Sequence, residues 1–212
     1  GNGTLYGAFN LLSSATWGDG DAAGLTEGSE RRTAVEDAYL GWRSGDRLPW
    51  LGEDGLDISA GHQVLTLGDG FLVQGDPVNV GDVDLGADFD RGGAYYLAGR
   101  KAFDQTVALR LGGSEGWRGD LMWLKSDNRF QAETELAIAN LEHVGDLGTL
   151  GISWIRGLDV SQRYAEIIGL QERDGMDTVS LRGRGGLGVE NLELAGEYVT
   201  QDKHSGRESA WY

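Results

Sequence analysis

Hydrophobic and polar residues alternate with a period of two over several short stretches of this chain. The clearest two stretches are residues 33–43 and 56–66, which are joined by a connection rich in Gly, Asp and Pro. In the first, the apolar residues Ala38, Leu40 and Trp42 alternate with Asp, Tyr, Gly and Arg. Successive side chains of a strand point to opposite faces, so the pattern predicts two β-strands, each with one apolar and one polar face.

The same alternation predicts further strands on both sides of this pair. The sequence Gly-Asp-Leu-Gly at 145–148 has the composition of a hairpin turn between two of them. We therefore expect a single all-β domain over residues 1–212, with about 12 antiparallel strands. The further strands are predicted at residues 4–17, 92–103, 104–113, 116–127, 132–144, 149–157, 176–184, 191–200 and from 208 onward.

Two long segments interrupt the alternation. Residues 67–92 form a Gly- and Asp-rich connection, and residues 159–173 carry apolar side chains at helical spacing, which predicts a short helix in a loop. If both segments lie on the same side of the sheet, an even number of strands must separate them. The pattern places five strands there, so one strand prediction must be wrong or residues must be absent from this sequence.

Composition and charge narrow the possible functions. The chain has 212 residues with 36 Gly, 2 Pro and no Cys, so disulfides and thiolate metal sites are excluded. Its net charge of −16 disfavours binding to a nucleic-acid backbone. The acidic residues gather in the predicted loops at 18–30, 52–55 and 81–90.

The pattern is compatible with a soluble β-protein and with a transmembrane barrel. No apolar run approaches the roughly 20 residues that a membrane helix needs. A barrel strand instead crosses in about 9–11 residues of alternating polarity, which keeps the mean hydropathy low. No signal peptide is visible at Gly1, so we expect either a processed secreted form or an incomplete chain.

Five arginines on the polar faces of the predicted strands are the candidate ligand-binding residues. A guanidinium group that faces lipid costs about 2–4 kcal/mol at the bilayer midplane, whereas in a water-filled lumen it costs little. Two roles remain open and do not exclude each other: ion pairing with Asp37, Asp57, Asp120, Glu193 and Glu197, or contact with an anionic sugar chain, whose carboxylates a guanidinium binds bidentately. The five are Arg43, Arg110, Arg118, Arg182 and Arg184.

Other motifs give weaker indications. The sequence GRGGLG at 183–188 fits a dinucleotide fingerprint, but an alternating stretch follows it, which indicates a turn between strands. Asp19, Asp21 and Glu30 sit at carboxylate positions of a calcium loop, without flanking helices, and form a loose Ca²⁺ candidate. No cofactor is otherwise expected, and no residue pattern identifies a catalytic site.

Aromatic residues recur within and at the ends of the predicted strands. In a soluble barrel they would form the core, whereas in a membrane barrel those at strand ends would form girdles at the two interfaces. The residues concerned are Trp17, Trp42, Tyr95, Trp117, Trp123, Trp154 and Tyr198.

Six motifs resemble the alginate-export family of bacterial outer-membrane β-barrels. The resemblance implies a barrel of about 18 strands, with an arginine-rich, electropositive constriction that passes a polyuronate. This chain is shorter than such a barrel requires, so we expect part of one or a shortened form. The export direction and alginate itself come from the resemblance alone. The motifs are DAYLGWRSGD, LDISAGHQ, LGDGFLV, FDQTVALRL, GWRGDLMWLKSD and TLGISWIRGLD.

The leading functional hypothesis is a passive, anion-selective porin in the bacterial outer membrane. It would contact lipid and lipopolysaccharide and pass an anionic sugar polymer or a small organic anion, and it would not be an enzyme. The alternative is a soluble all-β carbohydrate-binding protein, and a third class is a polysaccharide lyase or hydrolase. The orientation of the strands discriminates them, because a soluble barrel turns its apolar face inward and a membrane barrel turns it outward.

Overall fold

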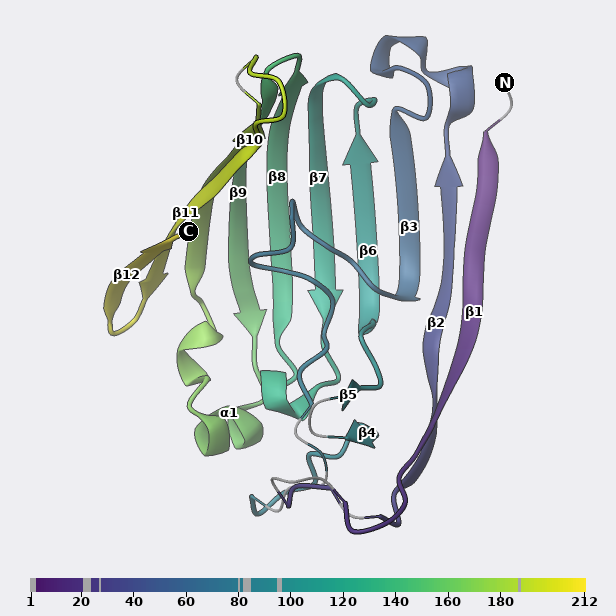
Figure 1. Ribbon diagram of the computed structural model, residues 1–212, viewed down its shortest axis with the longest axis vertical. Coiled ribbons are helices and arrows are strands. Elements are labelled where there is room, and N and C mark those ends of the chain that lie inside the picture. The colour runs from purple at the N-terminus through teal and green to yellow at the C-terminus, as the bar shows by residue number, and fades with distance from the viewer. Residues whose placement is uncertain are drawn as a thin grey trace.

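The computed structural model describes residues 3–20, 24–26, 28–79, 81, 85–94, 97–186 and 188–212, with no account of the side chains of 93–98. Ten strands form one antiparallel sheet in which neighbours along the chain are neighbours in space (Figure 1). The sheet strands are β1 (Thr4–Ala15), β2 (Arg31–Arg43), β3 (Leu56–Gln63), β6 (Phe103–Leu111), β7 (Gly116–Lys125), β8 (Glu135–Gly145), β9 (Gly148–Asp159), β10 (Asp177–Gly185), β11 (Leu194–Lys203) and β12 (Gly206–Trp211).

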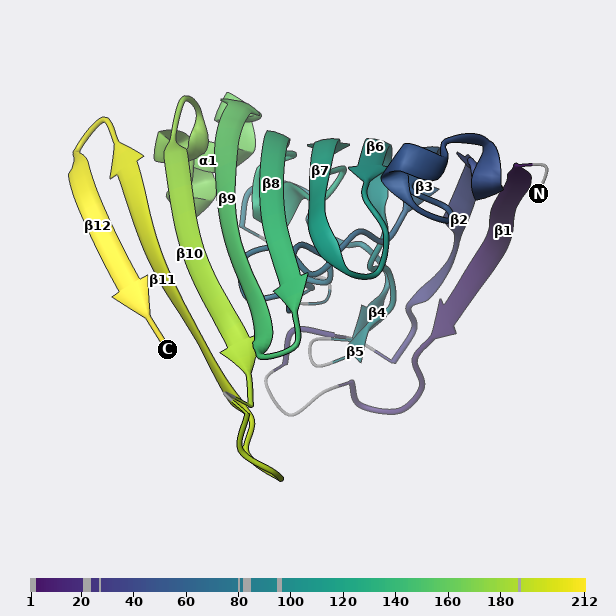
Figure 2. The same cartoon turned by 90° about the horizontal axis from the view of Figure 1, so that it is seen from above.

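The sheet curves into a trough that is open between β1 and β12 (Figure 2). The all-β, antiparallel prediction is therefore confirmed, but the sheet does not close into a barrel and has ten strands rather than twelve. The hairpin predicted at 145–148 is present, because Gly145 at the end of β8 pairs with Gly148 at the start of β9.

The strand predicted at residues 92–103 is wrong. Only the short β4 (Gly93–Ala94) and β5 (Leu97–Ala98) occur there, paired with each other, and the sheet resumes at Phe103. The physical reason is that Arg91 and Arg100 are buried in a polar network with Asp127, which holds this part of the chain inside the trough. Without this strand, four strands separate the two long connections, so both lie at the same end of the trough.

The long connections gather at the lower end of Figure 1. In strands of alternating direction, connections after every second strand share one end. That end carries the connections 16–30, 64–102, 126–134, 160–176 and 204–205, and the opposite end carries 44–55, 112–115, 146–147 and 186–193.

The connection between β3 and β6, residues 64–102, folds back into the trough and is called the interior segment here (Figures 1 and 2). Its buried Leu65, Leu67 and Val73 pack with Leu124 and Ile138, which point from the sheet to the same side. The main hydrophobic core therefore lies on the concave side, between the sheet and this segment.

The convex side of the sheet is apolar and lacks a covering layer among the described residues. One row of directly paired residues runs across eight strands on this face. Neighbouring convex residues are largely exposed, including Leu40 at 66% and Leu150 at 71%. The row comprises Leu5, Trp42, Ile58, Leu109, Leu121, Ala139, Trp154 and Val179.

The helix predicted within 159–173 is confirmed as α1 (Gln162–Ile168). Its buried Ala165 packs with Val160 and Ala132 in a small second cluster at the lower end of the trough. A short 3₁₀ turn follows α1 at Gln171–Arg173, and another, at Arg129–Gln131, lies between β7 and β8. Two more lie at Gly45–Arg47 and Pro49–Leu51, between β2 and β3. Within the described ranges, no helix is long and apolar enough to cross a membrane.

Candidate functional site

All five predicted arginines lie on the concave face. They lie in the half of the sheet near the end that carries the connections 112–115 and 146–147. Pairing aligns them with acidic residues in two rows across the strands. In the first row Arg43 pairs with Asp57, Asp57 with Arg110, and Arg110 with Asp120. Opposite charges that face each other across strands stabilise a sheet, so this row is a cross-strand charge ladder.

The second row lies beside the first, toward the short turns. Arg118 on β7 pairs with Glu142 on β8, and Arg182 on β10 pairs with Glu197 on β11. Gly151 on β9 separates the two pairs and leaves room for the Arg182 side chain, whose Cζ would be 3.1 Å from a Cβ at that position. The five arginines together are called the arginine ladder.

The ion-pairing role expected for these arginines is present throughout the ladder. Arg43 Nε lies 3.2 Å from Asp57 Oδ2, and Arg118 Nε lies 2.6 Å from Glu142 Oε2. Arg110 lies between Asp57 and Asp120, at 4.0 and 3.9 Å, too far for a hydrogen bond to either.

Of the three remaining expected acids, Glu193 pairs with Arg184 as predicted. Asp37 instead accepts a hydrogen bond from Asn10 Nδ2 at 2.6 Å, and Glu197 accepts one from Ser180.

Burial divides the ladder into two kinds of residue. The Arg182 side chain is 8% exposed, and it donates to Asn140 Oδ1 and Ser153 Oγ, both at 2.6 Å, besides its ion pair with Glu142. Its donors are therefore largely used within the protein. Arg43, Arg110 and Arg118 keep 36–48% of their side chains exposed on the concave side, so they retain donors for a ligand.

Two adjoining cavities of about 370 and 200 Å³ expose the ladder to solvent. Arg43 and Arg110 line the larger one, Arg182 and Arg184 line the smaller, and Arg118 lines both. The carboxylates that line them are Asp54, Asp57, Asp69, Asp120 and Glu142. Five arginines thus face five carboxylates, so the electropositive constriction that the resemblance implies is compensated in charge.

Glu142 is a carboxylate beside the arginine ladder that the sequence pattern did not identify. It bridges Arg118 on one side and Arg182 on the other. The alternation of β8 indicates that Glu142 shares a face with the arginines, because Ile138, Asn140 and Glu142 occupy successive positions on that face.

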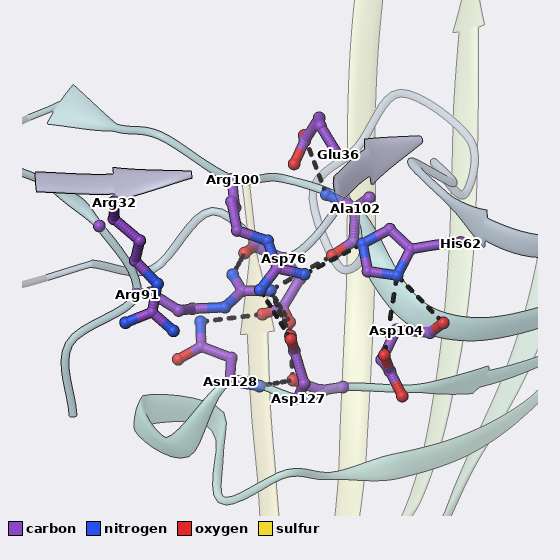
Figure 3. A network of polar contacts seen from close by, with 12 residues as sticks. Arg32, Glu36, His62, Asp76, Arg91, Arg100, Ala102, Asp104, Asp127 and Asn128 are labelled. Atoms are coloured by element: carbon purple, nitrogen blue, oxygen red, sulfur yellow. Dashed lines mark hydrogen bonds and ion pairs between the residues drawn. The ribbon is translucent and has the colours of Figure 1, made fainter. Parts of the chain in front are cut away.

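A second polar cluster fixes the interior segment to the rest of the protein (Figure 3). Arg91 Nη2 and Arg100 Nη1 both donate to Asp127 at 2.7 Å, and Arg91 also lies 3.2 Å from Asp76. Asn128 Nδ2 donates to Asp76 Oδ1 at 3.1 Å. These five residues form the anchor network, which ties three points of the segment to the connection between β7 and β8.

Burial and charge act in opposite directions on the two carboxylates of the anchor network. Burial raises the pKa of Asp76, and it outweighs the stabilising effect of Arg91, Ser126 and Asn128. Burial also raises the pKa of Asp127, but Arg91 and Arg100 together overcome it and hold this pKa below its ordinary value. Arg91 and Arg100 therefore stabilise the charged form of Asp127.

Contacts from β2 and β3 complete this attachment. Glu36 Oε1 accepts hydrogen bonds from the backbone amides of Lys101 and Ala102, at 2.8 and 3.2 Å. His62 Nε2 lies 3.0 Å from Arg100 Nη2. A guanidinium can only donate, so His62 accepts at Nε2 and donates through Nδ1 to the Asp104 carbonyl at 3.2 Å.

The calcium candidate is only partly within the described residues. Asp21 lies outside them, while Asp19 is exposed and Glu30 is half-buried. Across the part of the chain that the structure describes, no group of three or more His, Cys, Asp or Glu residues could hold a metal ion. The GRGGLG sequence leads from β10 toward β11, as predicted for a turn between strands, although Leu187 lies outside the description.

The predicted aromatic residues lie on the convex face or at a strand end, apart from Tyr95, which is outside the described residues. Trp117 is 67% exposed near the short turns and packs edge-on against His143. Trp17 is exposed at the opposite end, where Arg31 stacks on its ring.

A scan of the chain against models of known protein families finds no match, and a search of curated proteins finds none either. The resemblance to the alginate-export family therefore rests on the six sequence motifs, and it enters the function of this chain as a proposal.

Proposed function

We propose that this sheet forms the wall of an outer-membrane β-barrel channel. The channel would pass an anionic carbohydrate such as a polyuronate, or small organic anions. The observation that carries the proposal is the orientation of the strands. Large apolar side chains such as Phe9 and Leu150 are exposed on the convex face, while the arginine ladder lies on the concave face. A membrane barrel needs this arrangement, with lipid outside and water inside.

The dimensions of the strands support the same proposal. Most strands have 9–13 residues, and a tilted strand needs about 9–11 to cross a bilayer. The three longest connections, 64–102, 160–176 and 16–30, lie at one end, and two of the shortest, 112–115 and 146–147, lie at the other. Outer-membrane barrels have long external loops and short periplasmic turns, so the end with α1 would face outward.

The ladder suggests a passive mechanism without covalent chemistry. Arg43, Arg110 and Arg118 follow one another across β2, β6 and β7, and each keeps exposed donors beside a carboxylate. An anion would exchange its contacts from one guanidinium to the next. The neighbouring carboxylates keep each site weak, and several weak sites in series allow the anion to leave again.

Single-channel recording in a planar bilayer tests the proposal. We expect refolded protein to give an anion-selective conductance that oligouronate blocks. Arg110→Ala should weaken the block, because it removes a guanidinium group that is exposed in the larger cavity. The substitution breaks no close ion pair, so the fold should be retained. Arg47→Ala is the matched control, since Arg47 is an exposed arginine in a 3₁₀ turn outside the two cavities.

Three other outcomes would change the interpretation. Conductance that oligouronate does not block would retain the channel and remove the polyuronate cargo. An equal effect of Arg47→Ala and Arg110→Ala would remove the ladder as the site. Protein that stays monodisperse without detergent and gives no conductance would contradict the membrane proposal and favour a soluble carbohydrate-binding protein.

A further inference from the structure

A third cavity, of about 230 Å³, lies on the concave side at the opposite end from the arginine ladder. It lies between the interior segment, which contributes Val73 and Asp76, and the strands β8 to β11. The connection after α1 supplies Arg173, and the cavity is named after this residue. Of the lining residues, the Arg173 cavity shares none with the two cavities of the ladder.

Most of the wall of the Arg173 cavity is apolar. Val73, Phe103 and Ile155 are buried members of the main core, and Leu136 and Met176 add further apolar surface. The hydroxyl and amide groups on the wall are largely engaged with one another: Thr134 Oγ1 donates to a backbone carbonyl, and Gln201 Nε2 donates to Thr178 Oγ1 at 3.3 Å. The cavity therefore suits a ligand that is mainly apolar.

Arg173 supplies the one charge on this wall that has no partner of opposite sign in the described residues. Its Nη1 donates to Gln131 Oε1 at 2.5 Å, which leaves further N–H donors of the guanidinium available. Burial lowers the pKa of Arg173, and Asp76 only partly compensates for it. Because the Arg173 guanidinium is half-buried and has no carboxylate partner among the described residues, it is suited to bind an anion.

Asp76, the other charged residue on the wall, does not neutralise Arg173. Its carboxylate accepts hydrogen bonds from Ser126 Oγ at 2.6 Å and Asn128 Nδ2 at 3.1 Å, and it lies 3.2 Å from Arg91. In the anchor network the two carboxylates of Asp76 and Asp127 balance the two guanidinium groups of Arg91 and Arg100. Arg173 therefore leaves one net positive charge beside an apolar cavity.

We propose that the Arg173 cavity binds a small monocarboxylate with a short apolar chain. Its carboxylate pairs with Arg173, and its chain packs against Val73, Phe103 and Ile155. A guanidinium matches a carboxylate in planar, bidentate geometry. The volume is below the range of about 300–1,000 Å³ typical of drug-sized ligands, so a sugar polymer does not fit. This proposal does not depend on the channel function.

Titration calorimetry with hexanoate tests the proposal on the refolded full chain. We expect saturable binding with one site per chain, and much weaker binding of hexanamide, which has the same chain without the charge. Arg173→Gln should weaken hexanoate binding by about tenfold or more, equivalent to about 1.4 kcal/mol. Arg163→Gln is the matched control, because Arg163 is exposed on α1 and does not line the cavity.

A second variant tests the volume rather than the charge. Met176→Trp would fill the cavity from its wall and should abolish hexanoate binding while Arg173 stays in place. Equal binding of hexanoate and hexanamide, or wild-type affinity in Arg173→Gln or Met176→Trp, would overturn the proposal. Binding that Arg110→Gln abolishes and Arg173→Gln leaves unchanged would place the carboxylate on the arginine ladder instead, which also overturns it.

Discussion

Gly68 in the interior segment lies directly against the guanidinium group of Arg182 on β10. A Cβ added to Gly68 would be 2.6 Å from Arg182 Nε, and the backbone of Gly68 is left-handed, with φ of +58°. Gly151 lies on the other side of the same guanidinium. The segment thus covers the buried end of the arginine ladder at a position where the close contact and the left-handed backbone both favour glycine.

Gly68→Ala should loosen the interior segment from the wall. The substitution adds the cost of a left-handed alanine, about 1 kcal/mol, to a close contact with Arg182. We expect faster hydrogen exchange and proteolysis within residues 64–76. Gly86→Ala is the matched control, because Gly86 has φ of +82° in the same segment but its added Cβ would meet no atom of the described residues within 4 Å. Equal effects of both variants would contradict the role of the Arg182 contact.

A charge on the convex face should distinguish a lipid environment from water. Val107 is 47% exposed on β6, so Val107→Arg should be nearly neutral in water but should cost about 2–4 kcal/mol at the midplane of a bilayer. Gln105→Arg serves as the control, since Gln105 is exposed on the same face and strand, closer to its end. The measurement is the free energy of unfolding from lipid vesicles. Equal costs for both variants would contradict a lipid-facing convex surface.

Much of the sheet could be predicted from the sequence, because strand periodicity is a local signal. The alternation located the ten sheet strands, and the spacing of Val160 and Tyr164 located α1. It also placed all five ladder arginines on one face. Whether that face is concave or convex was not determined, because period two gives two faces without saying which one encloses the core.

The interior segment and its contacts could not be predicted, because they depend on contacts distant in sequence. The sequence pattern predicts a strand at 92–103, but the burial of Arg91 and Arg100 beside Asp127 holds this part of the chain inside the trough. The sequence pattern did not identify Arg173, because Arg173 lies in a connection, where the alternation of strand residues gives no information. The charge compensation by Glu142 likewise became visible only with the strand register.

Loss of the Asp127 carboxylate should destabilise the anchor network in a pH-dependent way. Asp127→Asn leaves Arg91 and Arg100 without their shared partner, and we expect a cost of about 2 kcal/mol near neutral pH. The pKa of Asp127 is depressed in the folded state, so its contribution is present above the ordinary value of about 4 and is lost as the pH falls through the folded value. The cost should therefore shrink below about pH 4.

Denaturant unfolding at neutral and acidic pH measures this effect. Asp104→Asn is the control, because Asp104 is more exposed, lies 3.7 Å from His62 and accepts a hydrogen bond from Gln105, without an arginine partner among the described residues. Asp76 acts with the opposite sign: its pKa is raised, so its protonation on acidification favours the folded state. A cost of Asp127→Asn that stays constant from neutral to acidic pH would contradict the assignment.

Two leucines on β7 separate the core side of the sheet from its outer side. Leu124 is fully buried on the concave side under the interior segment, whereas Leu121 is 54% exposed on the convex side. Leu124→Ala should cost about 2–5 kcal/mol through the cavity it creates, and Leu121→Ala should cost less than 1 kcal/mol. Denaturant unfolding of both variants without lipid measures the difference. A cost for Leu121→Ala as large as that for Leu124→Ala would mean that protein covers the convex face, and the open face that carries the channel proposal would be lost.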